Sequence, residues 1–383
     1  MFGPRLDACA SVDDFRALAA RRLPRVLFDY VDGGSYAEET LRRNVSAFRD
    51  HDLTQRIMVD VSSVASGVEL FGQSLQIPLI CAPVGFAGML ARRGEVQAAR
   101  AARAAGAPFC LSTVSICSIE EVASEAGEPP WFQLYMIRDR DWMAQLLARA
   151  GAAGCRVLVL TADLQTPAPR YRDIRSGMTR QLGFMENIKR SFEGLRKYGW
   201  TYDVIVRGRP HAFGNLAGVL PPAASFADAW EWIRNNFDPT VTWADLEFIR
   251  RHWRGAVVLK GVMCSDDARL ARDHGLDGIV VSNHGGRQLD GGRASLSALP
   301  EIVAAVGDTI VVMMDGGVRS GIHVVKAVNM GARACLIGRP WAYALAAGGE
   351  AGVRQMLCAF AAEIRTVQAL AGIPNFGAKA IQT

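Results

Sequence analysis

Short apolar runs alternate with segments of helical period along most of this chain. Each run is followed by a polar or glycine-bearing turn, and most are then followed by a helical stretch such as Glu95–Ala105, Asp141–Ala150 or Ser265–His274. Continuous apolar strands that alternate with helices predict a parallel sheet covered on both faces. The runs are Pro78–Ala82, Ala107–Leu111, Trp131–Leu134, Arg156–Leu160, Ala256–Leu259, Gly278–Val281, Thr309–Met314 and Ala332–Ile337.

Eight strand–helix units predict a closed (β/α)8 barrel, the TIM barrel, which usually spans about 250 residues plus insertions. An open doubly wound sheet is the alternative architecture. That sheet would carry GxGxxG after its first strand, and Ala82–Gly88 does not supply it. The α/β barrel is therefore the predicted fold.

Two regions fall outside the repeat, and one of them, 164–243, is too long for an ordinary loop. The other precedes the first strand and begins with the helix-like segment Asp13–Asp29. We expect a single domain over 1–383. Its parts are an N-terminal helical extension (1–77), the barrel (78–163 and 244–345), an insertion between the fourth strand and its helix that covers the active site (164–243), and a C-terminal helical tail (346–383).

Composition narrows the functional classes. The chain is 50% hydrophobic and 21% charged, with a net charge of +5, which predicts a globular protein and argues against a dedicated nucleic-acid binder. The eight cysteines form no CxxC pair, so buried thiols are expected and no metal site is predicted. There is no signal-peptide pattern, and no apolar run reaches the ~18 residues that span a bilayer.

The segment Ser282–Gln288 carries the strongest chemical signal. It places His284 and Arg287 where an apolar strand opens into a glycine-rich loop. Catalytic groups of such barrels lie at the carboxyl ends of the strands. A base beside a fixed cation suits a substrate that is an acid with a removable proton nearby.

The seventh and eighth strands end in Asp315–Arg319 and Gly338–Arg339. Glycines there expose backbone N–H groups and two arginines are available to clamp an anion, which predicts the phosphate site usual for this fold. The alternative is two surface arginines near ordinary turns.

Two other strand-end residues, and Arg170 in the insertion, have more than one interpretation. Lys260 is a Schiff-base nucleophile, a fixed cation beside a cofactor that gains charge, or a solvated lysine. Asp163 either orients His284 or caps a turn. Arg170 follows two prolines and either points inward or lies in solvent.

Taken together, these residues resemble the FMN-dependent α-hydroxy-acid dehydrogenases and oxidases, and within them the bacterial quinone-linked L-lactate dehydrogenases. Ser282–Asp290 matches the highly specific signature around the family's catalytic histidine, and the resemblance covers nearly the whole chain. Further matching stretches are Phe28–Gly34, Thr40–Val45, Ala82–Gly85, Ala91–Ala99, Trp131–Tyr135, Thr161–Asp163, Arg170–Asp173, Trp232–Pro239, Leu259–Gly261 and Asp315–Arg319.

The resemblance implies a role for each site residue. His284 would be the base, paired with Asp163, and Tyr135 would bond the substrate hydroxyl or the developing ketone. Arg170, Arg287 and Tyr30 would hold the substrate carboxylate. The cofactor FMN would be contacted along its ring and ribityl chain by Val84, Gly85, Ser112, Gln133, Thr161, Lys260 and Ser282. Its phosphate end would be held by Asp315, Gly317, Arg319, Gly338 and Arg339.

The implied reaction is oxidation of an L-2-hydroxy acid, L-lactate to pyruvate, with electrons passed to a quinone. L-mandelate as substrate and oxygen as acceptor stay open, as does proton removal from either the α-carbon or the hydroxyl. Gly85 matches a position that is often glycine in the dehydrogenases and alanine in the oxidases. Val114 is smaller than the aromatic residue of some glycolate-preferring relatives. A Schiff-base aldolase and a catalytically dead phospholigand-binding module are the competing classes.

Residues 185–200 predict a short basic amphipathic helix. Met185, Ile188, Phe192 and Leu195 fall at helical spacing, with Lys and Arg residues between and beside them. Such a helix suits an anionic membrane surface, although its apolar stripe could equally pack on the barrel rim. With the family resemblance, this implies a cytoplasmic protein bound peripherally to the cytoplasmic face of the inner membrane, and a homotetramer.

Overall fold

Eight parallel strands form the barrel in a computed structural model that describes residues 5–178, 183, 186, 192–208, 213–220 and 226–376. The hydrogen-bonded order is β3-β10-β9-β8-β7-β6-β5-β4, and a parallel bridge between Cys81 and Phe109 links the first and last strands. The predicted barrel is confirmed. The strands are β3 (Leu79–Cys81), β4 (Cys110–Ser112), β5 (Trp131–Tyr135), β6 (Val157–Thr161), β7 (Ala256–Val262), β8 (Gly278–Val281), β9 (Val311–Met314) and β10 (Ala334–Ile337).

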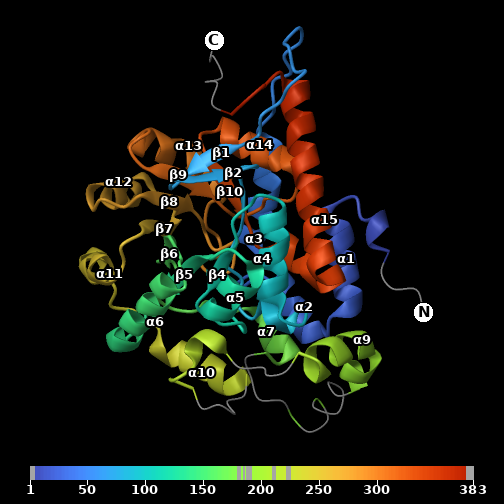
Figure 1. Ribbon diagram of the computed structural model, residues 1–383, viewed down its shortest axis with the longest axis vertical. Helices are drawn as coiled ribbons and strands as arrows, with labels where there is room; N and C mark the ends of the chain where they lie inside the picture. Colours follow the sequence, from blue (N-terminus) through green and yellow to red (C-terminus); the bar gives the residue numbers. More distant parts are fainter. Residues whose placement is uncertain are drawn as a thin grey trace.

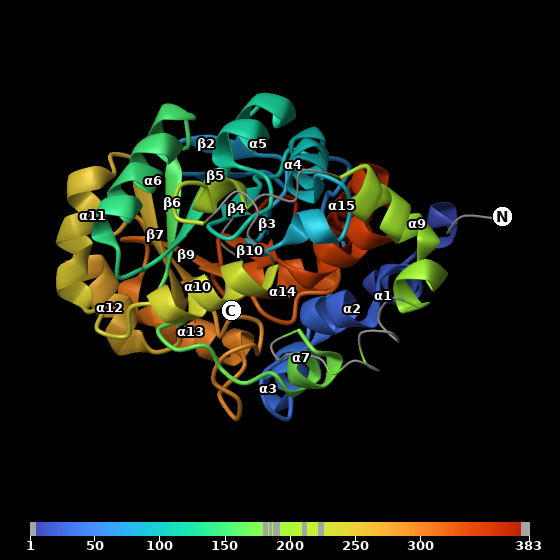
Figure 2. The same ribbon diagram turned by 90° about the horizontal axis from the view of Figure 1, so that it is seen from below.

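Helices cover the outside of the barrel, as Figures 1 and 2 show. Residues of the strands that face outward, such as Leu158 and Ile279, pack against them in one continuous core. These helices are α4 (Gly94–Ala104), α5 (Ile119–Ala126), α6 (Arg140–Ala152), α11 (Leu246–His252), α12 (Ser265–Asp273), α13 (Ser295–Val306), α14 (Gly321–Asn329) and α15 (Arg339–Ala371), with the short turns η3 (Ala87–Met89) and η6 (Trp243–Asp245).

The alternate strand residues point inward and fill the barrel. Val159, Val258 and Met313 belong to this second cluster, together with Leu70 and Leu75 of an antiparallel hairpin, β1 (Val68–Leu70) and β2 (Gln73–Leu75). The hairpin is tied to the barrel by a 3.0 Å hydrogen bond from Trp131 Nε1 to Gln73 Oε1. Because this end is packed with side chains, the opposite, carboxyl end of the strands is left for chemistry.

The N-terminal extension is helical, but the single segment predicted over Asp13–Asp29 is wrong. The structure has two helices there, because Pro24 cannot continue the first one. The extension comprises η1 (Leu6–Ala8), α1 (Val12–Arg22), α2 (Arg25–Asp32), α3 (Glu39–Ser46) and η2 (Ala47–Asp50). At the other end of the chain, α15 bends at Gly348–Gly349, where the backbone leaves helical geometry.

The insertion after β6 carries short helices that lie together with α10 at the lower end of the molecule in Figure 1. Its elements are α7 (Tyr171–Ser176), α9 (Tyr198–Trp200), the π-helical turn η4 (Thr201–Val206), η5 (Gly214–Leu216) and α10 (Phe226–Asn236). Of the predicted amphipathic helix, Met185 and Ile188 lie outside the described residues. Among the residues that are described, no helix is long and apolar enough to cross a membrane.

Candidate active site

A cavity of about 550 Å³ opens at the carboxyl ends of the strands. All but four of the predicted site residues line it, although they come from elements spread over the whole chain. They are Tyr30, Val84, Gly85, Tyr135, Thr161, Arg170, Lys260, His284, Arg287, Asp315, Gly317, Arg319, Gly338 and Arg339.

The other four, Ser112, Gln133, Asp163 and Ser282, lie directly behind the cavity wall. Ser112 Oγ donates a 3.1 Å hydrogen bond to Gln133 Oε1. Ser282 Oγ accepts from Lys260 Nζ at 2.9 Å and from the His284 backbone N–H at 3.0 Å. Each of these residues therefore touches a residue of the predicted site, and the structure brings the set together.

His284 and Asp163 form a close pair, with 2.8 Å between Nδ1 and Oδ1. Burial lowers the pKa of His284, and the Asp163 carboxylate opposes that shift. Burial also opposes ionisation of Asp163, but His284 and Lys260 outweigh it and lower the pKa of that carboxyl. The aspartate is therefore ionised at neutral pH and holds a neutral imidazole that is ready to accept a proton.

The loop that carries His284 has an unusual backbone. His284 has φ +58°, and Gly285 and Gly286 follow with φ +64° and +73°. A Cβ on Gly286 would lie 2.5 Å from the Leu41 backbone nitrogen, so only glycine fits there. A left-handed histidine stores strain, and such strain is concentrated at functional sites.

Two arginines and two tyrosines surround the space beside His284. Arg287 Nη1 donates to the Tyr30 and Gly33 carbonyls at 2.6 and 2.8 Å, which fixes its guanidinium over the Tyr30 ring. Burial, followed by the charge of Arg287, lowers the pKa of Arg170 to about 10. Two cations this close in a buried site favour the binding of an anion such as a carboxylate.

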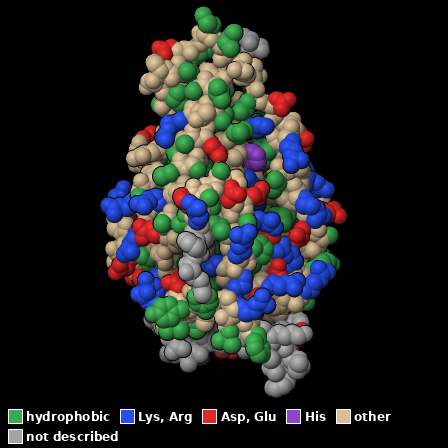
Figure 3. Space-filling view, turned by 90° about the vertical axis from the view of Figure 1, so that its right-hand side faces the viewer, with side chains coloured by type: hydrophobic (Ala, Val, Ile, Leu, Met, Phe, Trp, Pro, Cys, Tyr) green, Lys and Arg blue, Asp and Glu red, His purple; other side chains and the backbone are tan. Residues whose placement is uncertain are grey.

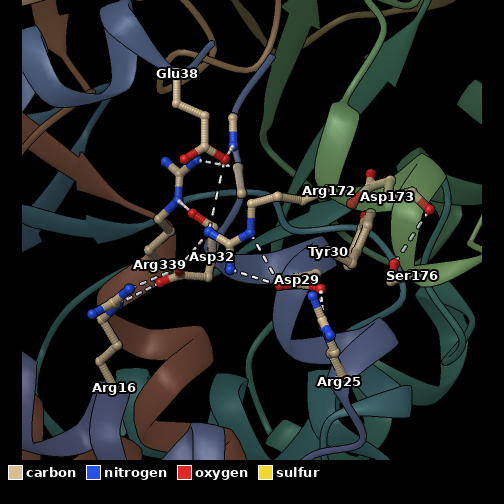
Figure 4. A network of polar contacts seen from close by, with 12 residues as sticks. Arg16, Arg25, Asp29, Tyr30, Asp32, Glu38, Arg172, Asp173, Ser176 and Arg339 are labelled. Atoms are coloured by element: carbon tan, nitrogen blue, oxygen red, sulfur yellow. Dashed lines mark hydrogen bonds and ion pairs between the residues drawn. The ribbon is translucent and has the colours of Figure 1, made fainter. Parts of the chain in front are cut away.

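A charge network around Asp32, which Figure 4 shows, holds the helix that follows Arg170. Its neighbour on α7, Arg172, contacts Asp32 Oδ2 at 2.7 Å and Asp29 Oδ1 at 2.8 Å, both on α2. Asp32 also accepts from Arg16 Nε at 2.5 Å and from the Tyr343 hydroxyl at 2.6 Å. The network ties α7, whose first turn follows Arg170, to α1, α2 and α15.

The deep wall of the cavity holds a buried lysine. Lys260 Nζ lies 3.0 Å from Asp315 Oδ2, and the lysine side chain is 5% exposed. Burial opposes its charge, but Asp315 and Asp163 outweigh burial and raise its pKa. A lysine whose pKa is raised is a poor Schiff-base nucleophile, which favours a fixed cation over the aldolase interpretation.

Arg319 and Arg339 also line the cavity, and Arg339 shares the Gly33 carbonyl with Arg287. Arg339 donates to the Gly285 and Gly33 carbonyls at 2.8 and 2.7 Å. Within the described part of the chain, no carboxylate lies at ion-pair distance from either guanidinium, and burial lowers the pKa of both, that of Arg339 to about 9. Two half-buried cations without an acidic partner among the described residues call for an anion from outside the protein.

The sequence alone did not identify every residue of this cavity. Asp173 lines it, as do Ile233, Arg234 and Phe237 from the insertion. The Phe237 ring packs edge-on against Tyr135, with 5.3 Å between ring centroids. Asp173 and Phe237 stand in stretches that carry the family resemblance, but their inward direction depends on how the insertion folds back.

Comparison with known proteins decides the family. Residues 19–380 match the FMN-dependent dehydrogenases. The chain belongs to this family. It is 53% identical over 364 residues to an L-lactate dehydrogenase of Caulobacter sp. (strain K31), with 95% of each chain covered. It is 50% identical over 366 residues to an L-lactate dehydrogenase of Pseudomonas syringae pv. syringae (strain B728a), with 96% of each covered.

The fold of this FMN-dependent dehydrogenase matches solved structures over 97% of the chain. A structure described as the monotopic membrane protein (S)-mandelate dehydrogenase superposes with a TM-score of 0.90 at 32% identity, covering 97% of each chain. A mandelate oxidase superposes with a TM-score of 0.82 at 38% identity, also covering 97% of each. The enzyme therefore shares its fold with both dehydrogenases and oxidases of the family.

The cavity fits FMN. Gln133 Nε2, Thr161 Oγ1 and Asp315 Oδ1 are buried and have no hydrogen-bond partner in the described protein, so they are free to bond a polar ring or its ribityl chain. Arg319 and Arg339 supply the charge that a phosphate requires. A Cβ on Gly317 would lie 1.9 Å from the Asn44 carbonyl oxygen, which requires glycine in the loop beside them.

Proposed function

We propose that this enzyme oxidises an L-2-hydroxy acid, L-lactate to pyruvate, and passes the electrons to a quinone. The observation that carries the proposal is one cavity lined by His284, Arg170 and Arg287, with Asp163 paired to His284 behind its wall. FMN, when bound, supplies the two-electron acceptor of the reaction. The L-lactate dehydrogenases at about half identity support this choice of substrate.

In this proposal Arg170 and Arg287 bind the substrate carboxylate and so orient the α-carbon. Arg287 is already held at Nη1 by two carbonyls, so its orientation does not depend on substrate. Tyr30 and Tyr135 stay protonated, because burial raises the pKa of both hydroxyls. Each can therefore donate a hydrogen bond, Tyr30 to the carboxylate and Tyr135 to the oxygen that becomes the ketone.

His284 takes the proton, from the α-carbon or from the hydroxyl. It starts neutral because burial lowers its pKa, and it gains charge during the reaction. The Asp163 carboxylate stabilises that charge across the 2.8 Å contact with Nδ1. Lys260 places a second positive charge at the deep wall and, with Val84, Gly85, Ser112, Gln133, Thr161 and Ser282, would hold the ring and ribityl end of FMN. Asp315, Gly317, Arg319, Gly338 and Arg339 would hold its phosphate end.

An anaerobic substrate panel tests the proposal. FMN-loaded enzyme is mixed with L-lactate, D-lactate, glycolate and L-mandelate, and loss of the flavin's visible absorbance is followed. We expect L-lactate to give the largest apparent second-order rate constant and D-lactate to give none. An enzyme that binds FMN but is bleached by none of these acids would overturn the proposal.

L-mandelate is the second candidate, favoured by the apolar wall that faces the substrate space. Val114, Ile233 and Phe237 are apolar cavity residues, and Val114 leaves more room than an aromatic residue would. A rate constant for L-mandelate at least tenfold above that for L-lactate would assign the enzyme to aryl hydroxy acids instead.

An exposed apolar surface around α9 supports a quinone acceptor, because membrane quinones are reached at the bilayer. Around α9 the large hydrophobic side chains of Phe192, Leu195, Tyr198, Tyr202 and Val206 are between 58% and 71% exposed. Figure 3 shows many Lys and Arg side chains over the lower half of the adjoining face. Apolar anchors beside basic groups suit peripheral binding to the anionic cytoplasmic leaflet.

Vesicle co-sedimentation tests this surface. We expect the enzyme to pellet with vesicles containing anionic phospholipid, and the Phe192→Asp/Leu195→Asp variant to stay in the supernatant with unchanged anaerobic reduction by L-lactate. Leu370→Asp, which alters an equally exposed side chain on α15, serves as control. If the Phe192→Asp/Leu195→Asp variant pelleted with the vesicles as fully as Leu370→Asp, this support for a membrane acceptor would be lost.

A homotetramer remains part of the proposal and rests on the family resemblance. Ile57 and Met58 are 78% and 99% exposed, and so offer an apolar contact to another copy. Light scattering of the FMN-loaded enzyme would give the mass directly, and a monomeric mass would contradict this part.

A further inference from the structure

Asp173 is a buried acid in a site built for an acid substrate. It is 1% exposed and lines the same cavity as Arg170 and Arg287. Its Oδ2 lies 3.7 Å from Arg170 Nη1, which is ion-pair distance but too long for a hydrogen bond. Both of its carboxylate oxygens are buried and accept no hydrogen bond from the described residues.

A carboxylate in this state is held in its charged form by Coulomb attraction alone. Buried carboxylates that stay ionised normally accept several hydrogen bonds. Asp32 does so in this protein, from Arg16, Arg172 and Tyr343, and Asp163 has one such partner, His284. Asp173 lacks that support, so the charge of its carboxylate depends on the two arginines beside it.

Several groups that carry or can carry charge face Asp173. Arg172 comes from its own helix and Arg170 from the position just before that helix. Arg287 comes from the loop after β8, and Asp29 and Tyr30 from α2. Burial raises the pKa of Asp173, the arginines oppose the shift, and Asp29 adds to it. The carboxylate of a substrate bound to Arg170 and Arg287 would raise the pKa of Asp173 further, as Asp29 does, because two negative charges in one buried site repel each other.

We propose that Asp173 is the resident counter-ion of the substrate-carboxylate site, and that it takes up one proton from solvent when a 2-hydroxy or 2-oxo acid binds there. The step converts one carboxylate to a carboxylic acid and involves no electron transfer. Release of the product reverses it. This inference rests on the proposed function, since it requires that Arg170 and Arg287 bind the carboxylate.

The sign of the pH dependence follows from linkage. A group whose pKa is higher in the complex than in the free enzyme takes up protons between the two pKa values. The affinity for the acid is therefore greatest below the pKa that Asp173 has in the free enzyme. It falls by up to about tenfold per pH unit in the window between this pKa and the pKa of Asp173 in the complex, and it is constant above that window. His284 also faces the anion and could take up a proton, so its contribution has to be separated.

Pyruvate binding to oxidised, FMN-loaded enzyme is the test. Proton uptake is measured by calorimetry in buffers of different ionisation enthalpy between pH 5.5 and 9, and the Kd by the change in the flavin spectrum. We expect Asp173→Asn to lower the maximal uptake by about one proton and to flatten the pH dependence of Kd, both in the wild-type and in the His284→Gln background. Above the window, Asp173→Asn should bind pyruvate more tightly than the wild type.

Controls separate this role from a purely structural one. Asp238→Asn removes another buried carboxylate, 2.6 Å from Arg140 and outside the cavity, and should leave proton uptake unchanged. If Asp173 only holds Arg170 in place, Asp173→Asn will weaken pyruvate binding at every pH and leave uptake unchanged, which overturns the proposal.

Infrared difference spectra give a second measure on wild-type enzyme. Pyruvate binding should produce the C=O stretch of a protonated carboxylic acid, and absence of that band would also overturn the proposal. Failure of the wild type to bind pyruvate at all would instead count against the proposed function.

Discussion

Replacing Asp163 with asparagine keeps the shape of its side chain and removes its charge. His284 gains a positive charge during the reaction, and its Nδ1 lies 2.8 Å from Asp163 Oδ1. Two unit charges about 4 Å apart interact by about 4 kcal/mol at an effective dielectric constant of about 20. At about 1.4 kcal/mol per factor of ten, loss of that attraction would slow proton removal by up to about a thousandfold.

The same substitution shifts the pH profile in a defined direction. Asp163 opposes the effect of burial on the pKa of His284, so removing its charge lowers that pKa further. A base must be neutral to act, and therefore the acid limb of kcat/KM for L-lactate should move to lower pH. Activity at neutral pH falls, although a larger fraction of His284 is in the neutral form.

Anaerobic stopped-flow mixing with L-lactate measures both effects. The reduction rate constant should fall between about a hundredfold and a thousandfold in Asp163→Asn, at full FMN occupancy. Asp266→Asn, at a side chain that is 86% exposed, is the matched charge control and should change it little. A loss below about fivefold, or an acid limb that moves to higher pH, would refute the reasoning.

Three further substitutions test separate parts of the account. Gly85→Ala should lower kcat/KM for L-lactate, because the new Cβ would lie 2.7 Å from Val114 Cγ2, and the Gly85→Ala/Val114→Ala double variant should recover most of the loss in the same assay. Gly317→Ala should lose FMN and lower the Tm, because its Cβ would lie 1.9 Å from the Asn44 carbonyl oxygen. Gly275→Ala, also at positive φ but with open space around the new Cβ, should keep its FMN. Equal losses of FMN in the two variants would contradict the role given to Gly317. Arg172→Gln should raise the KM for L-lactate about tenfold, which corresponds to ~1.4 kcal/mol of binding free energy, with a smaller change in kcat. The reason is that the substitution frees α7 from Asp29 and Asp32. An unchanged KM in steady-state kinetics would show that the network does not position Arg170.

The sequence predicted the barrel because buried parallel strands leave continuous apolar runs. It also predicted the site, since Ser282–Gln288 and the other strand ends must converge at one rim once the barrel closes. Pro24 shows a limit of prediction from periodicity. The helical pattern over Asp13–Asp29 continues through Pro24, but a proline cannot continue a helix, so the structure has two helices there. Asp173 and Phe237 show another limit, because their positions in the cavity depend on how the insertion folds over the barrel and no local periodicity records that.

The most direct test of the central claim is anaerobic mixing of FMN-loaded enzyme with L-lactate while the visible flavin absorbance is followed. We expect full bleaching by the wild type, recovery of colour on addition of a soluble quinone, and no bleaching in His284→Ala at equal FMN content. A wild-type enzyme that keeps its colour with L-lactate, or a His284→Ala variant that bleaches at the wild-type rate, would contradict the account.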